Sequence, residues 1–595
     1  MPTTRTKQGP DLRPRWTLEH PDAAAVAGLM RSEGVPELVA QLLVNRGIDD
    51  PAAAREHLAP DLKRLHDPFL LPGMGCATER LRAAIEHGEM ILVHGDYDVD
   101  GVTGTALLVR LLEQLGAQVA WHIPNRFTDG YSFGQHSVRR AREVDARVVI
   151  SVDNGTSEVE IISELAALGI DTIVTDHHEP PLGDLPPALA IVNPKLADSK
   201  YPFRELCGGA VAFKLAWALC QEVSGETRVR TDLRDFLVDA MAYVAIATVC
   251  DVVPLVDENR VLAHFGLKAL EQTNNPGLKA LLHVSGLGPR QLAGRRLGGD
   301  DVGFQIGPRI NASGRLESAA RAVELLLAQD DEQAARLARE LNELNERRKV
   351  LQRELTEAAL TEAARFEDPD RWPITVVAGQ GWHQGVVGIV AARLVETLGR
   401  PALVLGLDGE RGRGSARSIP GVSVLEIMHG GKQHMLRYGG HAQAAGCELR
   451  ADAVNDLREA LCARARELMA ESPPPEATLR IDAEIPLQAM TEELMRQVER
   501  LEPFGEQNGK PVLLSSDVRL AEPARLVGAD RSHLLLQLRQ GETVRKAMAF
   551  GMGARADELA MGQPLHVVYT PRWNTFRGTT NLELTLADFR VGERP

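Results

Sequence analysis

The stretch M90-I-L-V-H-G-D-Y-D-V-D-G-V-T-G104 joins an apolar run to a loop rich in ionisable side chains. The apolar residues 90–93 are typical of a buried strand, and the loop that follows carries His94, Asp96, Asp98 and Asp100. A strand that ends in such a loop places ligand atoms at the carboxyl edge of a sheet, where open α/β folds bind their ligands. We expect Asp98 and Asp100 to alternate along an extended segment, so that their carboxylates point in different directions and serve either two different ions or one ion and a water. An isolated turn of this composition is more often explained by backbone geometry alone.

The same pattern returns three times downstream. Residues 146–152 end in Asp153, residues 171–175 end in Asp176-His177-His178, and the apolar residues 241–250 end in Asp251. We interpret all of these runs as buried strands of one parallel sheet, whose carboxyl ends lie along one edge. The ionisable side chains predicted to converge there are His94, Asp98, Asp100, Asp153, His177 and Asp251.

Carboxylate and imidazole ligands without thiolates favour Mn²⁺ or Mg²⁺ over a structural zinc site. Six such ligands are too many for one ion with open positions, so we expect two ions roughly 3.5–4 Å apart. Such a pair lowers the pKa of a bound water and stabilises the attacking and leaving oxygens of phosphoester hydrolysis. We expect Asp153 to bridge the ions and His178 to hydrogen-bond a phosphoryl oxygen or the leaving group. The predicted catalytic residues are Asp153, Asp176 and His178.

These four motifs resemble those of the DHH phosphoesterase superfamily. The resemblance implies that His94, Asp98 and Asp153 hold one ion. It implies that the second ion is held by Asp100, Asp153, His177 and Asp251. Asp96 stands between His94 and Asp98 and could compete for the first ion. Because the superfamily contains pyrophosphatases, cyclic dinucleotide phosphodiesterases and nucleases, the motifs indicate the reaction type and leave the substrate open.

The chain has 595 residues, which at roughly 100–200 residues per domain predicts three or four domains. No apolar run approaches the roughly 20 residues of a membrane span, and the N-terminus lacks the apolar core of a signal peptide, so we expect a cytoplasmic protein. The six cysteines have no CxxC spacing, which argues against a zinc ribbon and a disulfide framework. The net charge of −15 means that any nucleic acid must be held in a local basic groove.

The pattern along the chain predicts an α/β multidomain protein. Residues 317–366 are nearly free of Gly and Pro and favour a long helix, and short strands at regular intervals after the proline-rich residues 471–476 predict a small β-barrel, most economically a five-stranded OB-fold. The expected parts are a helical N-terminal extension (1–87), a parallel-sheet catalytic domain (88–316), a connecting helix (317–366), a second α/β domain (367–470) and the barrel (477–595).

Three segments outside the metal motifs carry candidate substrate-binding residues. We interpret residues 307–316 as a Gly-rich loop whose side chains contact phosphate: Arg309, Asn311, Ser313 and Arg315. Gly-rich turns of the second α/β domain add His383, Ser415, Arg417 and His441. In the barrel, a loop-like segment too polar for a core carries Trp573, Phe576 and Arg577, which suit stacking of single strands beside cations. Solvated turns and core aromatics are the alternatives.

Residues 439–446, GGHAQAAG, are similar to the signature of the DHH-associated accessory (DHHA1) domain, and residues 501–508 resemble the segment that opens the barrel of RecJ-type nucleases. From residue 88 onward the order of parts resembles that family. The resemblance implies 5′→3′ hydrolysis of single-stranded DNA to 5′-mononucleotides in repair and recombination. It also implies a monomer without a membrane role, with a single-strand-binding protein and a RecQ-type helicase as further candidate partners. A phosphodiesterase acting on short oligonucleotides or cyclic dinucleotides is the alternative; a catalytically silent single-strand-binding factor would not need these metal ligands.

Overall fold

The computed structural model describes residues 13–130, 132–225, 228–292, 295–576 and 579–592. Contacts divide the chain into two compact units. The larger unit consists mainly of Trp16–Asn311, Ala319–Arg339 and the residues from Arg480 onward, and the smaller one of Ala312–Ser318 and Glu340–Leu479. In the described part of the chain, no helix is both long enough and apolar enough to cross a bilayer.

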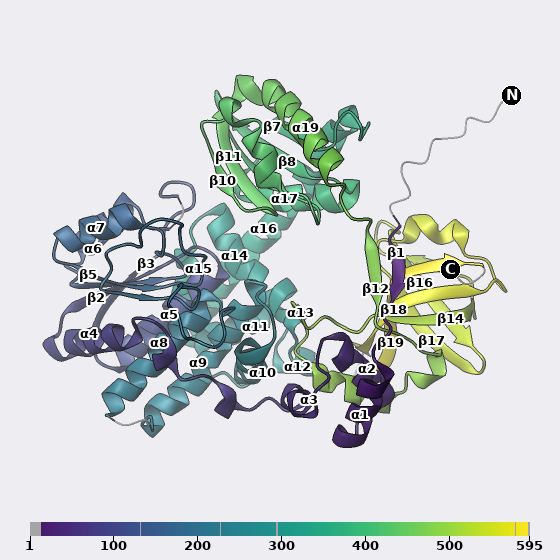
Figure 1. The fold of residues 1–595 in the computed structure, drawn as a ribbon, viewed down its shortest axis with the longest axis horizontal. Helices are drawn as coiled ribbons and strands as arrows, with labels where there is room; N and C mark the ends of the chain where they lie inside the picture. Colours follow the sequence, from purple (N-terminus) through teal and green to yellow (C-terminus); the bar gives the residue numbers. More distant parts are fainter. Residues whose placement is uncertain (1–12, 131, 226–227, 293–294, 577–578, 593–595) are drawn as a thin grey trace. The chain divides into compact units, whose positions relative to one another are not determined.

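A parallel five-stranded sheet with the order β3-β2-β4-β5-β6 is the centre of the first part of the larger unit (Figure 1). Its strands are β2 (Met90–Gly95), β3 (Gln118–His122), β4 (Val148–Val152), β5 (Asp171–Thr175) and β6 (Ala190–Val192). The central strand β4 is buried along its whole length. A strand covered on both faces has no polar face to present, which explains why its sequence is a continuous apolar run. The predicted parallel sheet is confirmed.

Helices cover both faces of this sheet (Figure 1). On one face, α6 (Gln135–Glu143) and α7 (Val159–Ala167) place Val138 and Leu165 in a common core with Leu92 and Val149 of the sheet. The other helices of this part are α4 (Met74–His87), α5 (Val99–Gln114), α8 (Gly208–Ser224), α9 (Thr231–Cys250), α10 (Asp257–Glu271), α11 (Pro276–Val284), α12 (Pro289–Leu292), α13 (Gly299–Asp301), α14 (Gly307–Leu316) and α15 (Ala320–Leu326).

Two segments of the chain differ from the sequence-based expectation. Residues 241–250, predicted as a strand, are the second half of α9. Residues 307–316, predicted as a Gly-rich loop, form the helix α14. An apolar run that is buried on all sides has no period that separates a strand from a helix. In α14 the glycines are compatible with a helix because it follows directly on the helical turns of residues 299–306.

Within the predicted N-terminal extension (1–87), residues between Val26 and Leu58 pack into the hydrophobic core of the barrel. The extension contains β1 (Arg15–Leu18), α1 (Ala23–Glu33), α2 (Glu37–Asn45) and α3 (Pro51–Leu58), and β1 pairs with β12 (Thr478–Ile481). Leu29 and Leu42 are fully buried in one cluster with Leu565 and Phe589 of the barrel. Arg260 of α10 is 3% exposed. Its guanidinium links α10 to α3 and to residues 500–502, because it donates to backbone carbonyls of both segments. The acceptors are His57, Arg500, Leu501 and Glu502.

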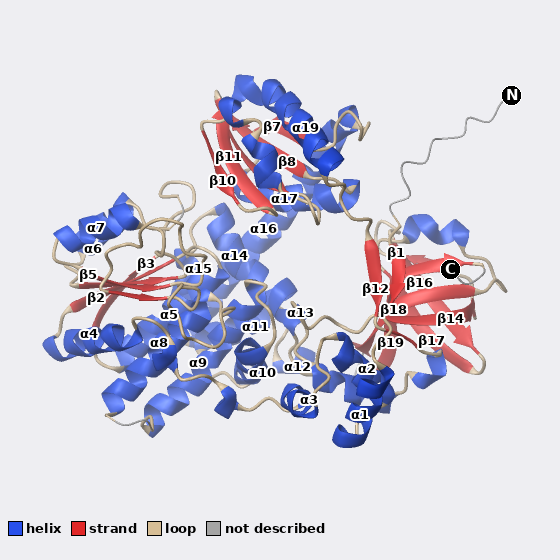
Figure 2. Cartoon of the chain, viewed as in Figure 1, coloured by secondary structure: helices blue, strands red, loops and turns tan. Residues whose placement is uncertain are grey.

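The C-terminal residues form a closed β-barrel (Figure 2). Its strands are β13 (Ala483–Glu484), β14 (Leu513–Leu520), β15 (Arg525–Val527), β16 (His533–Gln540), β17 (Thr543–Ala549), β18 (Leu565–Phe576) and β19 (Thr579–Val591), and α20 (Glu492–Val498) lies between β13 and β14. Strand β14 pairs with β18 on one side and with β16 on the other, so that β14, β18, β19, β17 and β16 close on themselves. The predicted five-stranded barrel is confirmed.

The smaller unit contains a five-stranded mixed sheet with the order β10-β11-β9-β8-β7. Its strands are β7 (Thr375–Gln380), β8 (Ala402–Asp408), β9 (Arg411–Arg417), β10 (Arg437–Gly440) and β11 (Ala444–Arg450). One face packs on α16 (Asp331–Ala363) and α17 (Gln384–Leu398), the other on α18 (Val424–His429) and α19 (Val454–Glu471). The long helix expected over residues 317–366 is therefore present, but it begins at Asp331 and follows the separate helix α15.

Candidate active site

Asp98 and Asp100 lie at the start of α5 and not on an extended segment. Asp98 is the N-cap residue, and its carboxylate accepts hydrogen bonds from the backbone N–H groups of Asp100 at 3.0 Å and Gly101 at 3.1 Å. The Asp100 carboxylate, 1% exposed, accepts hydrogen bonds from the backbone N–H groups of Gly208 and Gly209, both at 2.6 Å. Both amides belong to the first turn of α8, so two helix N-termini hold these carboxylates.

The two glycines of α8 are required by the space around the carboxylates. A Cβ atom at Gly208 would lie 2.6 Å from the Cβ of Asp153, and one at Gly209 would lie 2.8 Å from the Cβ of Ala247. The structure shows that these glycines let the N-terminus of α8 come close to Asp100 and Asp153.

We expect Gly208→Ala to weaken Mn²⁺ binding by about 10–100-fold, because the added methyl group displaces Asp153 from its position. Isothermal titration with Mn²⁺ measures the effect. Gly75→Ala in α4 is the matched control, since a Cβ atom there meets nothing within 4 Å. Equal Mn²⁺ affinities of the two variants would contradict the role of Gly208.

Asp153 follows β4 in the left-handed backbone conformation, with a φ of 65°. Its backbone N–H donates to the carbonyl of Thr175 at 2.9 Å, which fixes the turn to the neighbouring strand β5. The side chain is 3% exposed, and its Oδ1 accepts no hydrogen bond from the described residues. A buried carboxylate oxygen without a donor is costly unless a cation occupies its neighbourhood.

Three carboxylates from different parts of the fold lie around His177. Its Nε2 lies 3.2 Å from Asp153 Oδ1, 3.6 Å from Asp251 Oδ2 and 3.9 Å from Asp100 Oδ2. Asp251 is the C-cap of α9, so a helix and not a strand supplies this predicted ligand. Burial, followed by the charge of His178, lowers the pKa of His177 to about 4, so the imidazole is neutral at pH 7 and has a lone pair to offer.

The pKa values of the clustered carboxyl groups indicate an excess of negative charge. Burial, and then the charge of Asp98, raises the pKa of Asp100 to about 7. Burial, and then the charge of Asp100, raises the pKa of Asp251 to about 8 and that of Asp153 well above its usual range. Carboxylates that repel one another in a buried place are the donor set that hard divalent cations take.

We expect a rise from pH 5.5 to pH 8 in EDTA to lower the melting temperature of the wild type relative to that of Asp100→Asn/Asp251→Asn, in which the two carboxyl groups are absent and the buried histidines are unchanged. The folded-state pKa values of Asp100, about 7, and Asp251, about 8, lie above the usual value of about 3.9. Groups with raised pKa values contribute stability while protonated and lose that contribution as the pH rises through the folded-state value. Mn²⁺ should abolish the difference by neutralising the carboxylates. Differential scanning fluorimetry tests this, and the same change of melting temperature with pH in the wild type and the double variant would contradict it.

The ligand atoms fall into groups whose members lie within 4.8 Å of one another. Among the described residues, one group is Asp96, Asp98 and Asp153, a second is Asp100, His177 and Asp251, and a third is Asp153, His177 and His178. His94 belongs to none of these and forms a fourth group with His122 and His136. The structure thus brings Asp96 to the place beside Asp98 that the sequence assigned to His94, and His94 as a ligand of that ion stays a prediction.

Asp176 holds His178 as a cation. Its Oδ1 accepts hydrogen bonds from His178 Nδ1 at 2.7 Å and from the backbone N–H of His177 at 2.8 Å, while Oδ2 accepts from the backbone N–H of Thr156 at 3.0 Å. Burial alone would lower the pKa of His178, but the hydrogen bond to Asp176 and its charge raise that pKa to about 9. His178 Nδ1 lies 3.9 Å from Asp153 Oδ1. His178 is therefore protonated at neutral pH beside the carboxylate cluster.

In the smaller unit, three of the predicted substrate-binding residues lie around the start of α17. His383 is its N-cap and accepts a hydrogen bond from the backbone N–H of Gly385 at 3.1 Å. Arg417 Nη1 donates to Ser415 Oγ at 2.8 Å, and a Cβ at Gly388 of α17 would lie 3.0 Å from that oxygen. Burial lowers the pKa of Arg417, and no described carboxylate offsets it. A half-buried guanidinium near a helix N-terminus suits an anion.

The predicted phosphate-binding residues of segment 307–316 do not point to one place, because the segment is a helix and not a loop. In a helix, Arg309 and Ser313 share one face because they are four residues apart, and Asn311 and Arg315 share another. Arg309 Nη1 donates to the carbonyl of Gln305 at 2.6 Å, and Ser313 is fully buried. Arg315 Nη1 donates to the carbonyl of Gly385 at 3.4 Å, which places it near the start of α17.

Three family models match successive segments of the chain. The model of the DHH family, N-terminal domain, matches residues 90–243, the DHHA1 domain matches 373–467 and the RecJ OB domain matches 481–588. The single-stranded-DNA-specific exonuclease RecJ of Bacillus subtilis (strain 168) is 38% identical over 584 residues, which are 97% of this chain and 71% of that protein. The chain belongs to the RecJ family.

Further RecJ relatives agree in sequence and in fold. The RecJ exonuclease of Escherichia coli (strain K12) is 33% identical over 93% of this chain and 95% of its own. The crystal structure of RecJ in complex with Mn²⁺ from Thermus thermophilus matches 98% of this chain and 80% of its own with a TM-score of 0.81 and 30% identity. The DHH match contains every predicted ligand except Asp251, and the DHHA1 match contains Arg417 and His441.

The aromatic platform predicted for the barrel of this RecJ-family chain is only partly described. Trp573 was expected to be an exposed base-stacking residue in a loop, but it lies in β18, packs against the barrel core and donates from Nε1 to Glu499 at 2.5 Å. That expectation for its surroundings was wrong, because a polar sequence around an aromatic residue does not prevent the ring from packing inward. The side chain of Phe576 and the whole of Arg577 lie outside the described residues. His441 is exposed in the turn between β10 and β11.

Sequence reasoning missed an exposed aromatic residue on the barrel. Phe550 is 47% exposed directly after β17, with the His533 ring 5.3 Å away in a T-shaped contact and the Arg572 guanidinium 5.6 Å from its centroid. An exposed ring beside a cation suits a nucleic-acid base. The only sequence signal was an apolar aromatic residue just beyond a strand end, which also fits an ordinary surface residue.

Proposed function

We propose that this RecJ-family chain hydrolyses single-stranded DNA from the 5′ end and releases 5′-mononucleotides, with two Mn²⁺ or Mg²⁺ ions as cofactors. The observation that carries the proposal is the cluster of mutually repelling carboxylates around neutral His177, with protonated His178 beside it. The relatives named as single-stranded-DNA-specific exonucleases support the substrate class.

The donor set fits two hard divalent cations. Asp96 Oδ1, Asp153 Oδ1 and Asp251 Oδ2 are buried without a hydrogen-bond partner among the described residues, which leaves their lone pairs for metal ions. Asp96, Asp98 and Asp153 would hold one ion. Asp100, His177 and Asp251 would hold the other, with Asp153 shared between both. Bound there, the ions would lower the pKa of a water and stabilise charge on the phosphoryl oxygens.

The residues of the chain hold the metal ligands in place and supply one proton. The N-termini of α5 and α8 hold Asp98 and Asp100 in place through backbone N–H groups. Asp176 keeps His178 protonated and orients its ring, so that the imidazolium can donate a proton to a phosphoryl oxygen or to the leaving 3′-oxygen.

We propose that the 5′ polarity comes from phosphate recognition in the smaller unit. Arg417, Ser415 and His383 surround the start of α17, where the helix dipole adds to the charge of the guanidinium. Arg315, His441 and, on the barrel, Phe550 are proposed as further contacts to the strand. Recruitment by a single-strand-binding protein or a RecQ-type helicase, and action as a monomer, remain predictions of the family resemblance.

We expect Arg417→Gln to reduce the preference for a 5′-phosphate over a 5′-hydroxyl end by about 10–100-fold, since a charge-assisted hydrogen bond contributes about 1.5–3 kcal/mol. Competition binding with the two oligonucleotides in EDTA measures the preference without turnover. Arg411→Gln, at the exposed opposite end of β9, should leave the preference unchanged. A preserved preference in Arg417→Gln would place 5′-end recognition elsewhere.

The proposed function is tested by digestion of a long single-stranded DNA labelled at the 5′ or the 3′ end, with Mn²⁺ or Mg²⁺, against EDTA and a duplex of the same sequence. Early release of the 5′ label as a mononucleotide, only from the single strand and only with metal, is the expected result. Consumption of dinucleotides or cyclic dinucleotides while long DNA survives would overturn the substrate and favour the alternative, a small-molecule phosphodiesterase with the same metal centre.

A further inference from the structure

Three histidines form a separate cluster at the edge of the catalytic sheet. His94 is the penultimate residue of β2, His122 is the last residue of β3, and His136 stands in the first turn of α6. Their ring centroids are 5.2 Å (His94–His122), 5.4 Å (His122–His136) and 5.7 Å (His94–His136) apart, and each ring offers a nitrogen within 4.8 Å of the others. No carboxylate of the active-site groups belongs to this cluster among the described residues.

Each of the three rings has one buried nitrogen without a hydrogen-bond partner in the described structure: His94 Nδ1, His122 Nε2 and His136 Nε2. His94 is fully buried and His136 is 6% exposed, so water does not satisfy these atoms freely. Buried polar atoms are normally paired, and three unpaired ones in one cluster call for a shared partner.

The second ring nitrogens of His94 and His136 have hydrogen-bond partners, as is usual for metal-binding histidines. His94 Nε2 lies 2.9 Å from Ser137 Oγ, so a proton on Nε2 leaves the Nδ1 lone pair available. The His136 ring hydrogen-bonds the backbone of Ser132, which leaves its Nε2 lone pair available in the same way. Histidine ligands of metals usually donate their second N–H to a hydroxyl, carbonyl or carboxylate that fixes the ring.

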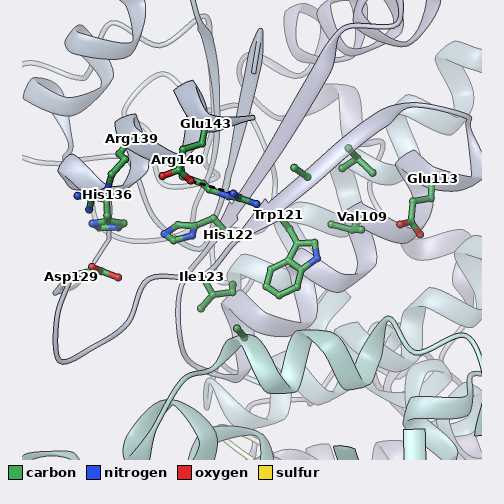
Figure 3. Close-up of a pocket in the computed structure, with 13 residues that line it drawn as sticks. Val109, Glu113, Trp121, His122, Ile123, Asp129, His136, Arg139, Arg140 and Glu143 are labelled. Carbon is green, nitrogen blue, oxygen red and sulfur yellow. Dashed lines mark hydrogen bonds and ion pairs between the residues drawn. The ribbon is translucent and has the colours of Figure 1, made fainter. Parts of the chain in front are cut away.

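A cavity of about 650 Å³ gives access to the cluster. Figure 3 shows His122 and His136 on its wall with Asp129 beside His136. The Asp129 charge favours a cation at both rings, whereas Arg139 opposes one at His136 and Arg140, which pairs with Glu143 at 3.3 Å, opposes one at His122.

We propose that His94, His122 and His136 form a binding site for one Zn²⁺ ion, distinct from the oxygen-rich catalytic centre, so that His94 serves this ion in place of the catalytic ion to which the family resemblance assigned it. Imidazole nitrogens suit Zn²⁺ and Co²⁺, whereas carboxylates suit Mn²⁺ and Mg²⁺, so the two sites select different ions. Zn–N bonds of about 2.0–2.1 Å place ligand nitrogens about 3.4 Å apart, and the three ring nitrogens already lie within 4.8 Å of one another. The ion cross-links the ends of β2 and β3 to the start of α6, with Asp129 or a water in the fourth position.

The test is equilibrium dialysis of the full chain against Zn²⁺ in excess Mg²⁺, with metal analysis and with the visible spectrum of Co²⁺ as a second probe. The wild type should bind one Zn²⁺, show an intense tetrahedral Co²⁺ spectrum and melt at a higher temperature with Zn²⁺. His122→Ala/His136→Ala should lose at least about 100-fold in affinity. The milder single variant His122→Asn, verified as folded by circular dichroism, should also lose the tetrahedral spectrum.

Two controls separate this site from other sources of zinc binding. His264→Ala removes a half-buried imidazole outside the cluster, on α10, and should keep the wild-type stoichiometry and affinity. Asp153→Asn disrupts the proposed catalytic centre and should also keep the Zn²⁺ ion. Wild-type Zn²⁺ affinity in the double histidine variant, or loss of Zn²⁺ only in Asp153→Asn, would overturn the proposal while leaving the proposed nuclease function standing.

Discussion

Asp153→Asn is expected to lower turnover on single-stranded DNA by on the order of 10³-fold or more while leaving DNA affinity nearly unchanged. Asp153 is the carboxylate shared by the two proposed ions, and its unpaired Oδ1 lies 3.2 Å from His177 Nε2. An amide at this position has the same shape but half the ligand capacity and no charge. Asparagine also tolerates the left-handed backbone conformation, with a φ of 65°, so the fold should be retained.

Single-turnover release of a 5′ label measures the chemistry, and fluorescence anisotropy in EDTA measures DNA binding. Asp145→Asn is the matched control, because Asp145 also has a left-handed backbone, with a φ of 53°, but is exposed and belongs to none of the ligand groups found among the described residues. It should retain wild-type turnover. Turnover within a few-fold of wild type in Asp153→Asn would exclude Asp153 as a shared ligand.

Lys214→Met is expected to cost about 3–5 kcal/mol of stability, because it leaves the charge of Glu258 buried without its partner. Both side chains are fully buried, and Lys214 Nζ donates to Glu258 at 2.5 Å and to the carbonyl of His66 at 2.8 Å. The hydroxyl of Tyr201 donates to the same carboxylate and cannot replace the cation.

Urea denaturation followed by tryptophan fluorescence is the measurement, with Trp217 as a local reporter, since its ring lies 4.8 Å from Lys214 Nζ. Arg230→Met breaks the exposed pair with Asp232 in the same unit and should have no measurable effect. Lys214→Met combined with Glu258→Gln should recover part of the loss, because the stranded charge is removed. A single variant as stable as the wild type would show that the pair contributes little.

The strand ends of the catalytic sheet could be predicted because buried parallel strands are continuous apolar runs. The positions of Asp153 and of Asp176-His177-His178 followed directly from that pattern. Residues 241–250 have the same apolar character but form a helix. Asp251 nevertheless lies in the carboxylate cluster, because the buried helix α9 ends beside it just as the buried strands do.

Contacts between distant segments could not be predicted from local patterns. The hydrogen bonds from Gly208 and Gly209 to Asp100 join residues more than a hundred positions apart, and nothing in either segment marks the other. Whether Asp96 or His94 faces Asp98 depends on the direction in which side chains leave the end of β2. A sequence shows that both are near but not which one points inward.

The left-handed backbone conformation at Asp153 brings the stability of the fold and catalytic turnover into conflict at this position. A non-glycine residue held at a φ of 65° carries a conformational penalty of about 1 kcal/mol or more, and the unsatisfied carboxylate adds a further cost. Glycine at this position would therefore favour a more robust fold at the expense of a working enzyme. A screen that selects only for thermal stability should therefore favour inactive variants at position 153. An engineering screen on this protein has to select for turnover and thermal stability together.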